Sequence, residues 1–549
     1  MPPIDKRAEG VVKRYEALVQ QRMTTEQGWQ RMAELMRPLR ADIRVKRSPG
    51  QQRTQQVFDG TALKSINDLA SALSGSMTSV DYQWFNLQMG FEPLNEIWEV
   101  RTWLEDCSRR IYLAFQQSNF GSEIHELYQD LIVFGTACMW MDERPIRATK
   151  FNGFVFKTIA PGRYVLAEDH EGRPNVVGSE ITMSHASAIE QFGSAVVSEQ
   201  TRKVAAKNPD EPLVIVRFIE PLSPGEATPR RKYRLMFIEK ESKVLLRESF
   251  LKQLRVLAPR WDKASEEVYG TGRGHIAYPD VATLNRAVEL RWRQWAKAID
   301  PPVLTIDDGV IGKLRLMSGT RTVVRSRDAV APFESGAKFD VANFQEEQIR
   351  QAIRNYFFSD QLLIPNKSFM TAFEVSSHIE QMQRMLAPST TRLKVELFNP
   401  LIDYAFDALM TAGVLPPPPD AVVEAVSQGF TDIAVVYTSP LTRSQRANEV
   451  GAFQQVLAAT QTLVASNPGL MDNYDGDVII REASVNTGVP SRWLVPIEAR
   501  DAKREEAAAR QAQAEEAALA SSNASTAETS FKAMKTASEI GPQAGVGGA

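Results

Sequence analysis

Two glycine-containing stretches have the composition of loops that hold phosphate groups. The run "GTGRG" (270–274) places Gly270, Gly272 and Gly274 at the start of an amphipathic helical pattern. A dinucleotide-binding loop requires the spacing G-x-G-x-x-G after a strand, and the third glycine here comes one position too early. The stretch "DGTALKS" (59–65) lacks the glycine that precedes the lysine of a P-loop, and its aspartate is placed to cap a helix. Neither stretch meets the requirements of a nucleotide site.

Patterns that would bind metal or perform catalysis are also incomplete. The histidines form neither an H-E-x-x-H site nor a close His/Cys pair; they are His125, His170, His185, His275 and His378. The run "DNYDGD" (472–477) offers Asp472, Asp475 and Asp477 as oxygen ligands, but without the remainder of a calcium loop we expect a turn. No G-x-S-x-G elbow is present, and carboxylates alternate with Lys and Arg along helical patterns. We therefore expect no catalytic residue, metal or cofactor.

A basic stripe is the remaining candidate. In the helix expected at 280–299, six apolar side chains fall within an arc of about 80°; they are Val281, Leu284, Val288, Trp292, Trp295 and Ile299. Arg286, Arg293 and Lys297 lie on the opposite side. The sequence "DPP" ends this helix, because proline lacks a backbone donor and restricts the residue before it. These cations are either a solvated helix face or a local nucleic-acid contact.

The composition limits how such a contact could work. The 549 residues are enough for about three or four domains. A formal net charge of −3 excludes a globally basic protein, so any contact with nucleic acid must be local. Cys107 and Cys138 cannot form a disulfide framework and lie in apolar helical patterns, which favours a reducing environment. The longest near-apolar run, 131–141, is shorter than the roughly 20 residues of a membrane span, so we expect a soluble protein.

Hydrophobic periodicity predicts an α+β protein that is predominantly helical. Helices are expected at 5–37, 60–78, 95–118 and 122–141, followed by a β-rich region at 150–260. Two further helices are expected at 280–299 and 345–361, and a long helix is expected from 372 that kinks at Pro388 and Pro400 and ends at Gly413 and four prolines. A strand within 432–441, helices at 442–466 and 474–487, and an Ala/Glu/Arg-rich end from 501 follow. The last roughly 20 residues are expected to be disordered.

Three runs in this order resemble one known family. They are "FDGTALKSINDLASALSGSMTS", "YGTGRGHIAYPDVATLNRAVELRWRQWAKAIDPPVL" and "MTAFEVSSHIEQMQRMLAPSTTRLKVELFNPLIDYAFDALMTAGVLPPPP". Together they resemble the portal, or head-to-tail connector, proteins of short-tailed bacteriophages. The resemblance covers most of residues 10–440, and beyond 440 it extends only to length and helical character.

The resemblance implies a ring, usually a dodecamer, whose subunit has a wing, stem, clip and crown. The parts implied are a wing at 1–279 that also receives residues 415–441, a stem helix at 280–299, a clip at 300–344, a second stem helix at 345–361, a tunnel loop at 362–370, a long kinked helix with the wing return strand at 371–441, crown helices at 442–500, and a C-terminal helix with a disordered tail at 501–549.

The resemblance also implies roles for particular residues. Those expected to face a DNA channel are Lys367, Asn366, Ser368, Arg286, Arg293 and Lys297. Those expected in the clip, in contact with the terminase and later the tail adaptor, are Lys313, Arg315, Arg321 and Arg325. Those expected to pack against neighbouring subunits are Trp292, Trp295, Ile349, Ile353 and Tyr356. Those expected to form a hinge, with backbone angles that other residues resist, are Gly270, Gly272 and Gly274.

The implied function is a non-enzymatic ring at one capsid vertex. A terminase large subunit packs double-stranded DNA through it, the genome later leaves through it, and the tail attaches to it through an adaptor protein. Its other implied partners are further copies of itself and the major capsid and scaffolding proteins, with assembly in the host cytoplasm and no membrane. Two alternatives remain: a structural ring or scaffold of another phage assembly without a DNA channel, and a nucleotide-dependent enzyme.

Overall fold

The chain forms two compact units. The computed structural model describes residues 6–45, 48, 50–144, 151–299, 303–305, 310–311, 323–324, 330–332, 339–362, 389–429, 433–437, 476–487, 493–495 and 497–539. The larger unit comprises Met1–Gly90, Trp103–Pro418 and Gly429–Thr442, and the smaller one Phe91–Thr102, Pro419–Gln428 and Arg443–Ala549.

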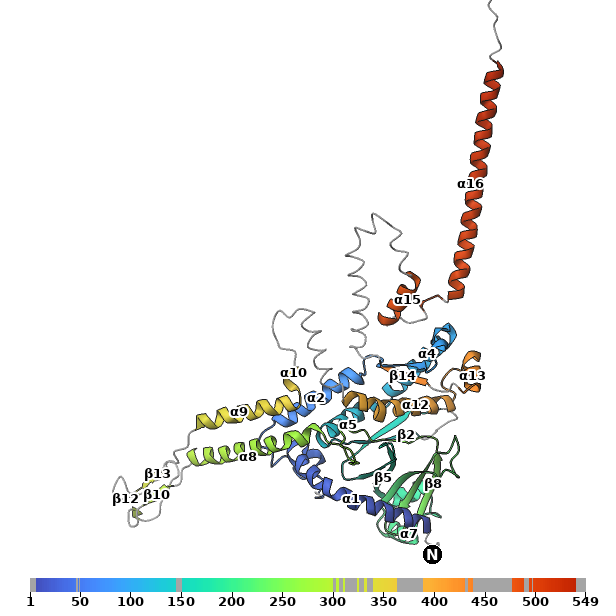
Figure 1. Ribbon diagram of the computed structural model, residues 1–549. Helices are drawn as coiled ribbons and strands as arrows, with labels where there is room; N and C mark the ends of the chain where they lie inside the picture. The colour runs from blue at the N-terminus through green and yellow to red at the C-terminus, as the bar shows by residue number, and fades with distance from the viewer. Residues whose placement is uncertain are drawn as a thin grey trace, which may run out of the picture. The chain divides into compact units, whose positions relative to one another are not determined.

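The larger unit contains a five-stranded antiparallel sheet in which each strand pairs with the next along the chain (Figure 1). Its strands are β4 (Tyr164–Glu168), β5 (Pro174–Ser184), β6 (Pro212–Pro221), β7 (Tyr233–Glu239) and β8 (Leu245–Leu251). Helices α6 (His185–Phe192) and α7 (Glu199–Lys207) connect β5 to β6. The β-rich region predicted at 150–260 is confirmed.

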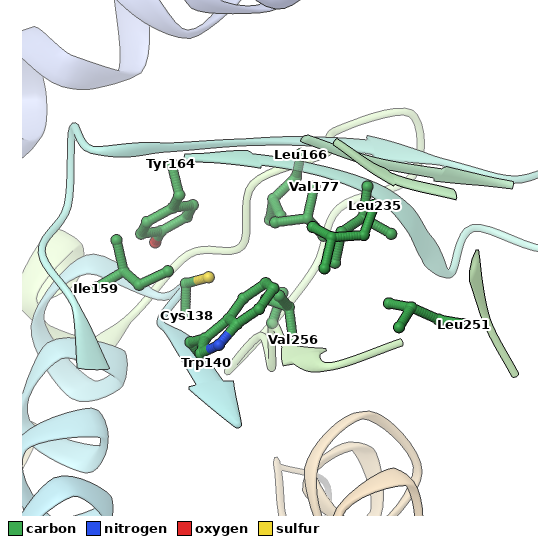
Figure 2. Packing of buried hydrophobic residues seen from close by; sticks show 11 residues of the cluster. Cys138, Trp140, Ile159, Tyr164, Leu166, Val177, Leu235, Leu251 and Val256 are labelled. Atoms are coloured by element: carbon green, nitrogen blue, oxygen red, sulfur yellow. The ribbon is translucent and has the colours of Figure 1, made fainter. Parts of the chain in front are cut away.

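One face of this sheet packs against a second, three-stranded sheet. The second sheet has the order β3 (Phe154–Ile159), β2 (Cys138–Glu143), β9 (Val256–Leu257). Figure 2 shows Cys138 and Trp140 of β2 facing Tyr164, Leu166 and Leu235 of the larger sheet. Burial raises the pKa of the Cys138 thiol to about 12, so this cysteine is a packing residue without thiolate chemistry.

The other face of the five-stranded sheet is covered by α1 (Lys6–Met36). Ala8, Val12 and Tyr15 of this helix pack on Val216 and Phe218 of β6. Successive side chains of a strand point to opposite faces, so β6 supplies both cores, and this explains why its sequence is apolar on both faces apart from the buried Arg217.

One helix prediction is wrong at its end. The helix expected at 122–141 is α5 (Phe120–Phe134), and residues Cys138–Glu143 form β2 instead. The helix ends because Gly135 adopts a left-handed conformation with φ of 74°, which glycine accepts without steric cost. The apolar run therefore changes from helix to strand at a single glycine, and Cys138 lies in a strand.

The two long helices predicted on either side of the insertion run antiparallel. They are α8 (Arg273–Ile299) and α9 (Phe339–Tyr356), which lie side by side in Figure 1. Arg291 near the end of α8 forms an ion pair of 2.6 Å with Glu346 near the start of α9. Asp280 near the start of α8 bonds Tyr356 at the end of α9. In the insertion, β10 (Val303–Thr305) pairs with β13 (Val330–Pro332), and β11 (Val310–Ile311) pairs with β12 (Val323–Val324).

The boundaries of these helices differ from the prediction. Helix α8 begins inside the glycine run, seven residues before the predicted start at 280, and it continues through Pro279. Helix α9 begins at Phe339, within the segment assigned to the clip, and it ends at Tyr356 because Phe358 has a φ of 58°. A bulky residue in that region interrupts helical geometry, and α10 (Ser359–Leu362) follows as a separate turn.

The larger unit contains several further elements. They are η1 (Pro38–Arg40), α2 (Thr61–Met77), β1 (Phe85–Met89), most of α4 (Trp98–Gln116), the π-helical segment η3 (Lys394–Phe398), α12 (Asn399–Thr411) and β14 (Ile433–Tyr437), which pairs with β1. The predicted stop at Gly413 is confirmed, with a φ of 67°. The predicted kink at Pro400 coincides with the change from η3 to α12, and the one at Pro388 lies outside the described residues.

The smaller unit is helical in its described part. It contains α3 (Glu92–Glu96), α13 (Asp420–Ser427), α15 (Gly476–Thr487) and α16 (Ile497–Glu539). Asp477 in the first turn of α15 pairs with Arg500 and Arg504 of α16 at 2.9 and 2.5 Å. The expectation of disorder over the last roughly 20 residues is wrong for those up to Glu539, because α16 reaches that residue. The helix predicted at 442–466 lies outside the described residues.

A buried ion cluster connects three separate parts of the larger unit. The Arg260 side chain has no exposed surface, and its guanidinium pairs with Glu168 at the end of β4 and with Glu396 of η3, the latter at 2.7 Å. The backbone N–H of Arg260 also donates to Glu396 over 2.9 Å. Burial opposes the charge of Arg260, but the two carboxylates outweigh it and raise the guanidinium pKa. Removing one partner would leave a buried charge uncompensated.

We predict that Glu396→Ala lowers the free energy of unfolding of the subunit by about 3–5 kcal/mol, the usual cost of breaking a buried ion pair. Urea denaturation followed by circular dichroism measures this change. Glu199→Ala is the control, since Glu199 pairs with Lys203 on an exposed helix face and its loss should leave the unfolding midpoint unchanged. Equal midpoints for Glu396→Ala and the unsubstituted chain would contradict the prediction.

Candidate functional site

The glycine run 270–274 packs directly against the end of α5. A Cβ atom on Gly272 would lie 2.5 Å from the carbonyl oxygen of Ile132, and one on Gly274 would lie 2.4 Å from that of Val133. A Cβ atom on Gly270 would lie 2.5 Å from the carbonyl oxygen of Gly135. All three distances are shorter than any real carbon–oxygen contact, so only glycine fits at these positions.

Close packing, and not an unusual backbone conformation, requires glycine at these three positions. None of Gly270, Gly272 and Gly274 is among the glycines with positive φ, so the expectation that they adopt backbone angles other residues resist is wrong. They are required because two backbone segments approach closely. Their role as a hinge stays a prediction.

The first three backbone N–H groups of the run are used within the chain. Gly270 donates to Thr136 Oγ1 over 2.7 Å and Thr271 to the carbonyl of Asp262 over 2.7 Å. Gly272 donates to His275 Nδ1 over 3.1 Å, and burial lowers the pKa of this histidine, which keeps the nitrogen able to accept. A phosphate-binding loop directs free N–H groups at its ligand, whereas these three groups are engaged within the chain and the glycines pack against α5.

The second glycine stretch is a helix cap, as predicted. Thr61 donates its N–H to the Asp59 carboxylate over 2.9 Å at the start of α2. The same carboxylate pairs with Arg350 of α9 at 3.0 Å. Both features lower the pKa of Asp59 despite its burial, so the stretch joins α2 to α9.

The apolar face of α8 changes character along its length. Val281, Leu284 and Val288 are buried within the chain. Trp292 and Trp295, which continue the same face, are 57% and 44% exposed, with ring centroids 6.2 Å apart. Two adjacent exposed tryptophans on a helix are typical of a surface that another protein covers.

The basic stripe of α8 contains an acidic residue that the sequence reading missed. Arg286 and Arg293 are exposed, and each pairs with the carboxylate of Glu289 at 2.6 Å. Lys297 is exposed one turn farther on. The spacing of three and four residues from Glu289 to the two arginines is the signal that could have revealed this arrangement.

Asn285 is a second residue that sequence reasoning missed. It lies between these faces of α8, where its side-chain oxygen accepts from the N–H of Phe58 over 2.7 Å and its amide donates to the carbonyl of Gln56 over 2.8 Å. It thereby attaches α8 to the loop before α2. An asparagine on a helix gives no sequence signal for such a role, because its partners lie more than two hundred residues away.

The packing residues predicted on α9 separate into two groups. Ile353 has no exposed surface, and it packs inside its own chain next to the turn that contains Phe357. It therefore has no surface left for a neighbouring subunit, which corrects that assignment. Ile349 and Tyr356 are partly exposed.

The other predicted site residues cannot be placed. Asn366, Lys367 and Ser368 lie outside the described residues, as do the basic residues of the insertion, Lys313, Arg315, Arg321 and Arg325. Within the described part of the chain, no group of three or more His, Cys, Asp or Glu side chains could hold a metal ion. None of the described helices combines the length and apolar character needed to cross a membrane.

Comparison with known proteins decides the family. The family described as bacteriophage head to tail connecting protein matches residues 8–495. The chain belongs to this family. It is 26% identical over 511 residues to the "Probable portal protein" of Bordetella phage BPP-1, a match that covers 87% of this chain and 88% of that one. It is 26% identical over 525 residues to the "Portal protein" of Salmonella phage epsilon15, covering 91% of each.

The resemblance noted in the sequence is thereby confirmed. Both relatives are portal proteins of phages, and the family implies that this connector is a virion component at the junction of head and tail, where copies of the chain form a ring. Membership of the family rests on nearly the whole chain, including residues beyond 440 where the sequence resemblance was weakest.

We predict that Gly135→Ala strongly destabilises the connector, because its Cβ would lie 2.3 Å from the backbone nitrogen of Gly272. Gly413→Ala is a matched control. Gly413 also ends a helix at positive φ, but a Cβ there meets nothing within 4 Å. The control should cost only the backbone strain of about 1–2 kcal/mol, and Gly135→Ala should cost clearly more in thermal unfolding. Equal losses would show that the close approach is not decisive.

Proposed function

We propose that the connector forms a ring through which double-stranded DNA enters the phage head during packaging and leaves it during ejection. Its membership of the portal family carries this proposal, and the arrangement of α8 supports it. In the proposal α8 and α9 form the stem, the insertion between them the clip, and the sheets the wing. A terminase supplies the ATP hydrolysis, the clip docks first the terminase and later the tail adaptor, and residues 362–370 form a tunnel loop.

The dimensions of α8 suit a channel wall. Its 27 residues rise about 40 Å at 1.5 Å per residue, and the same length of DNA duplex presents about 24 phosphate charges at one per about 1.7 Å. Helices of this length arranged around an axis would enclose a segment of duplex. The exposed Arg286, Arg293 and Lys297 would then hold DNA near the axis.

The overall charge supports passage of DNA without tight binding. Each chain contributes a net charge of −3, and a ring multiplies that value by its number of copies. A broadly repulsive body with a few cationic positions would centre the duplex without stalling it. A uniformly basic channel would bind the phosphates strongly and resist movement.

The direct test is DNA packaging with purified components. Rings seen by negative-stain electron microscopy should support ATP-dependent packaging when terminase and procapsids are added, and the connector alone should hydrolyse no ATP. Rings that are dispensable for packaging would favour a structural scaffold. Hydrolysis by the connector alone would favour a nucleotide-dependent enzyme.

We predict that the double substitution Trp292→Ala and Trp295→Ala weakens ring assembly but hardly changes the stability of the single subunit, since both side chains are largely exposed within it. The concentration needed for assembly, measured by light scattering, should rise roughly tenfold or more. Leu284→Ala is the contrasting variant. Leu284 lies on the same face but is buried, so its loss should cost about 2–5 kcal/mol in the subunit itself. Unchanged assembly of the double variant would show that the two tryptophans do not contribute to the interface between subunits.

We predict that Lys367→Glu leaves ring assembly intact but reduces the completeness of packaging. Lys367 is the only charged residue in "LLIPNKSFM" (362–370), and ring symmetry would repeat it as a collar of cations. Its contact with phosphates is screened beyond about 8 Å at physiological salt, so the defect should depend on ionic strength. Wild-type packaging by this variant at both low and high salt would show that the collar has no role.

A further inference from the structure

The two arginines of the α8 stripe converge on one carboxylate. Arg286 donates through Nη1 to Oε2 of Glu289, and Arg293 donates through Nη2 to Oε1, each over 2.6 Å. The Glu289 side chain is 16% exposed, and the arginines that bond it are 59% and 64% exposed. The carboxylate thus lies beneath two guanidinium groups that remain open to solvent.

We propose that Glu289 is a built-in counter-charge that weakens the grip of the stem on DNA. This inference rests on the proposed function, because it requires the stripe to face the duplex. Glu289 would hold Arg286 and Arg293 in a partly neutralised state, so that a passing phosphate meets two cations already engaged with a carboxylate. Glu289 is a positioning residue in this scheme, since it acts on DNA only through the arginines.

Glu289 would weaken DNA binding because each arginine must exchange the carboxylate for a DNA phosphate. A free arginine that contacts a phosphate releases condensed counterions, and that release drives most non-specific DNA binding. An arginine paired with Glu289 must either leave the carboxylate or bring the phosphate close to it. Leaving the carboxylate gives up a charge-assisted hydrogen bond, and bringing the phosphate close to it adds repulsion between two negative charges. Each arginine–phosphate contact therefore contributes less free energy of binding. Hydrogen bonding to Arg286 lowers the pKa of Glu289, which keeps the counter-charge ionised at physiological pH.

Stability of the helix does not require this arrangement. Exposed ion pairs at these spacings contribute little to folding. Helix α9 has a comparable pair, in which Glu347 accepts from Arg354 over 2.6 Å and lies 3.5 Å from Arg350. Arg350 is also held by Asp59 and Glu346. Glu347 therefore provides a matched control with the same chemistry outside the basic stripe.

The test measures binding of double-stranded DNA to purified rings as a function of salt. Glu289→Gln keeps the shape of the side chain and removes its charge. We expect at least a tenfold gain in affinity at low salt, a steeper fall of affinity with rising salt, and slower packaging. Glu347→Gln should match the wild type. Unchanged affinity and salt dependence for Glu289→Gln, or an equal gain for Glu347→Gln, would overturn the proposal.

A second set of variants separates this proposal from the proposed function. Arg286→Gln with Arg293→Gln should bind DNA more weakly than the wild type, and adding Glu289→Gln should then produce no further gain. If wild-type rings package DNA but these variants behave like the wild type, the proposal fails and the channel function stands. If wild-type rings do not support packaging, the channel function itself fails. Loss of rings in both Glu289→Gln and Glu289→Ala would assign Glu289 to assembly and overturn the proposal.

Discussion

The close approach of the glycine run to the end of α5 determines where α8 begins. Gly135 ends α5 in a left-handed conformation, and Gly270 and Gly272 pack their backbones on it at distances that exclude any side chain. The carbonyl of Gly135 accepts a hydrogen bond from the N–H of Trp261 over 2.9 Å, so a third chain segment joins this contact. Because backbone packs on backbone here, the starting point of α8 has little freedom to move relative to α5.

The ion cluster of Arg260 reinforces the same region. Arg260 lies immediately before Trp261, so the segment that packs on Gly135 is also attached to Glu168 of the five-stranded sheet and to Glu396 of η3. Glu396 lies in η3, the π-helical segment that interrupts regular α-helical geometry just before Pro400 and α12. The five-stranded sheet, α5 and the start of α8 are consequently connected through the segment that contains Arg260 and Trp261.

The exposure of the apolar face of α8 changes along the helix. As far as Val288 the helix buries Val281, Leu284 and Val288 within the chain, whereas the part beyond it exposes Trp292 and Trp295 on the same face. A ring of identical copies satisfies such a face by placing a neighbour against it. On the opposite side of α8, the exposed Arg286 and Arg293 are both paired with Glu289.

The sequence by itself determined the kinds of element and the family. Helical periodicity, the β-rich region and the ordered motifs around 270–304 are local properties of the chain, and local properties can be read from spacing. The tertiary structure decided what those residues contact. The glycines of "GTGRG" proved to be packing residues because Gly135, more than a hundred positions away, occupies the space beside them. Ile353 proved to be internal, and Cys138 proved to lie in a strand after Gly135 stopped the helix. The packing of the glycines depends on contact with a segment distant in sequence, and hydrophobic periodicity shows only that a face is buried, without showing what buries it.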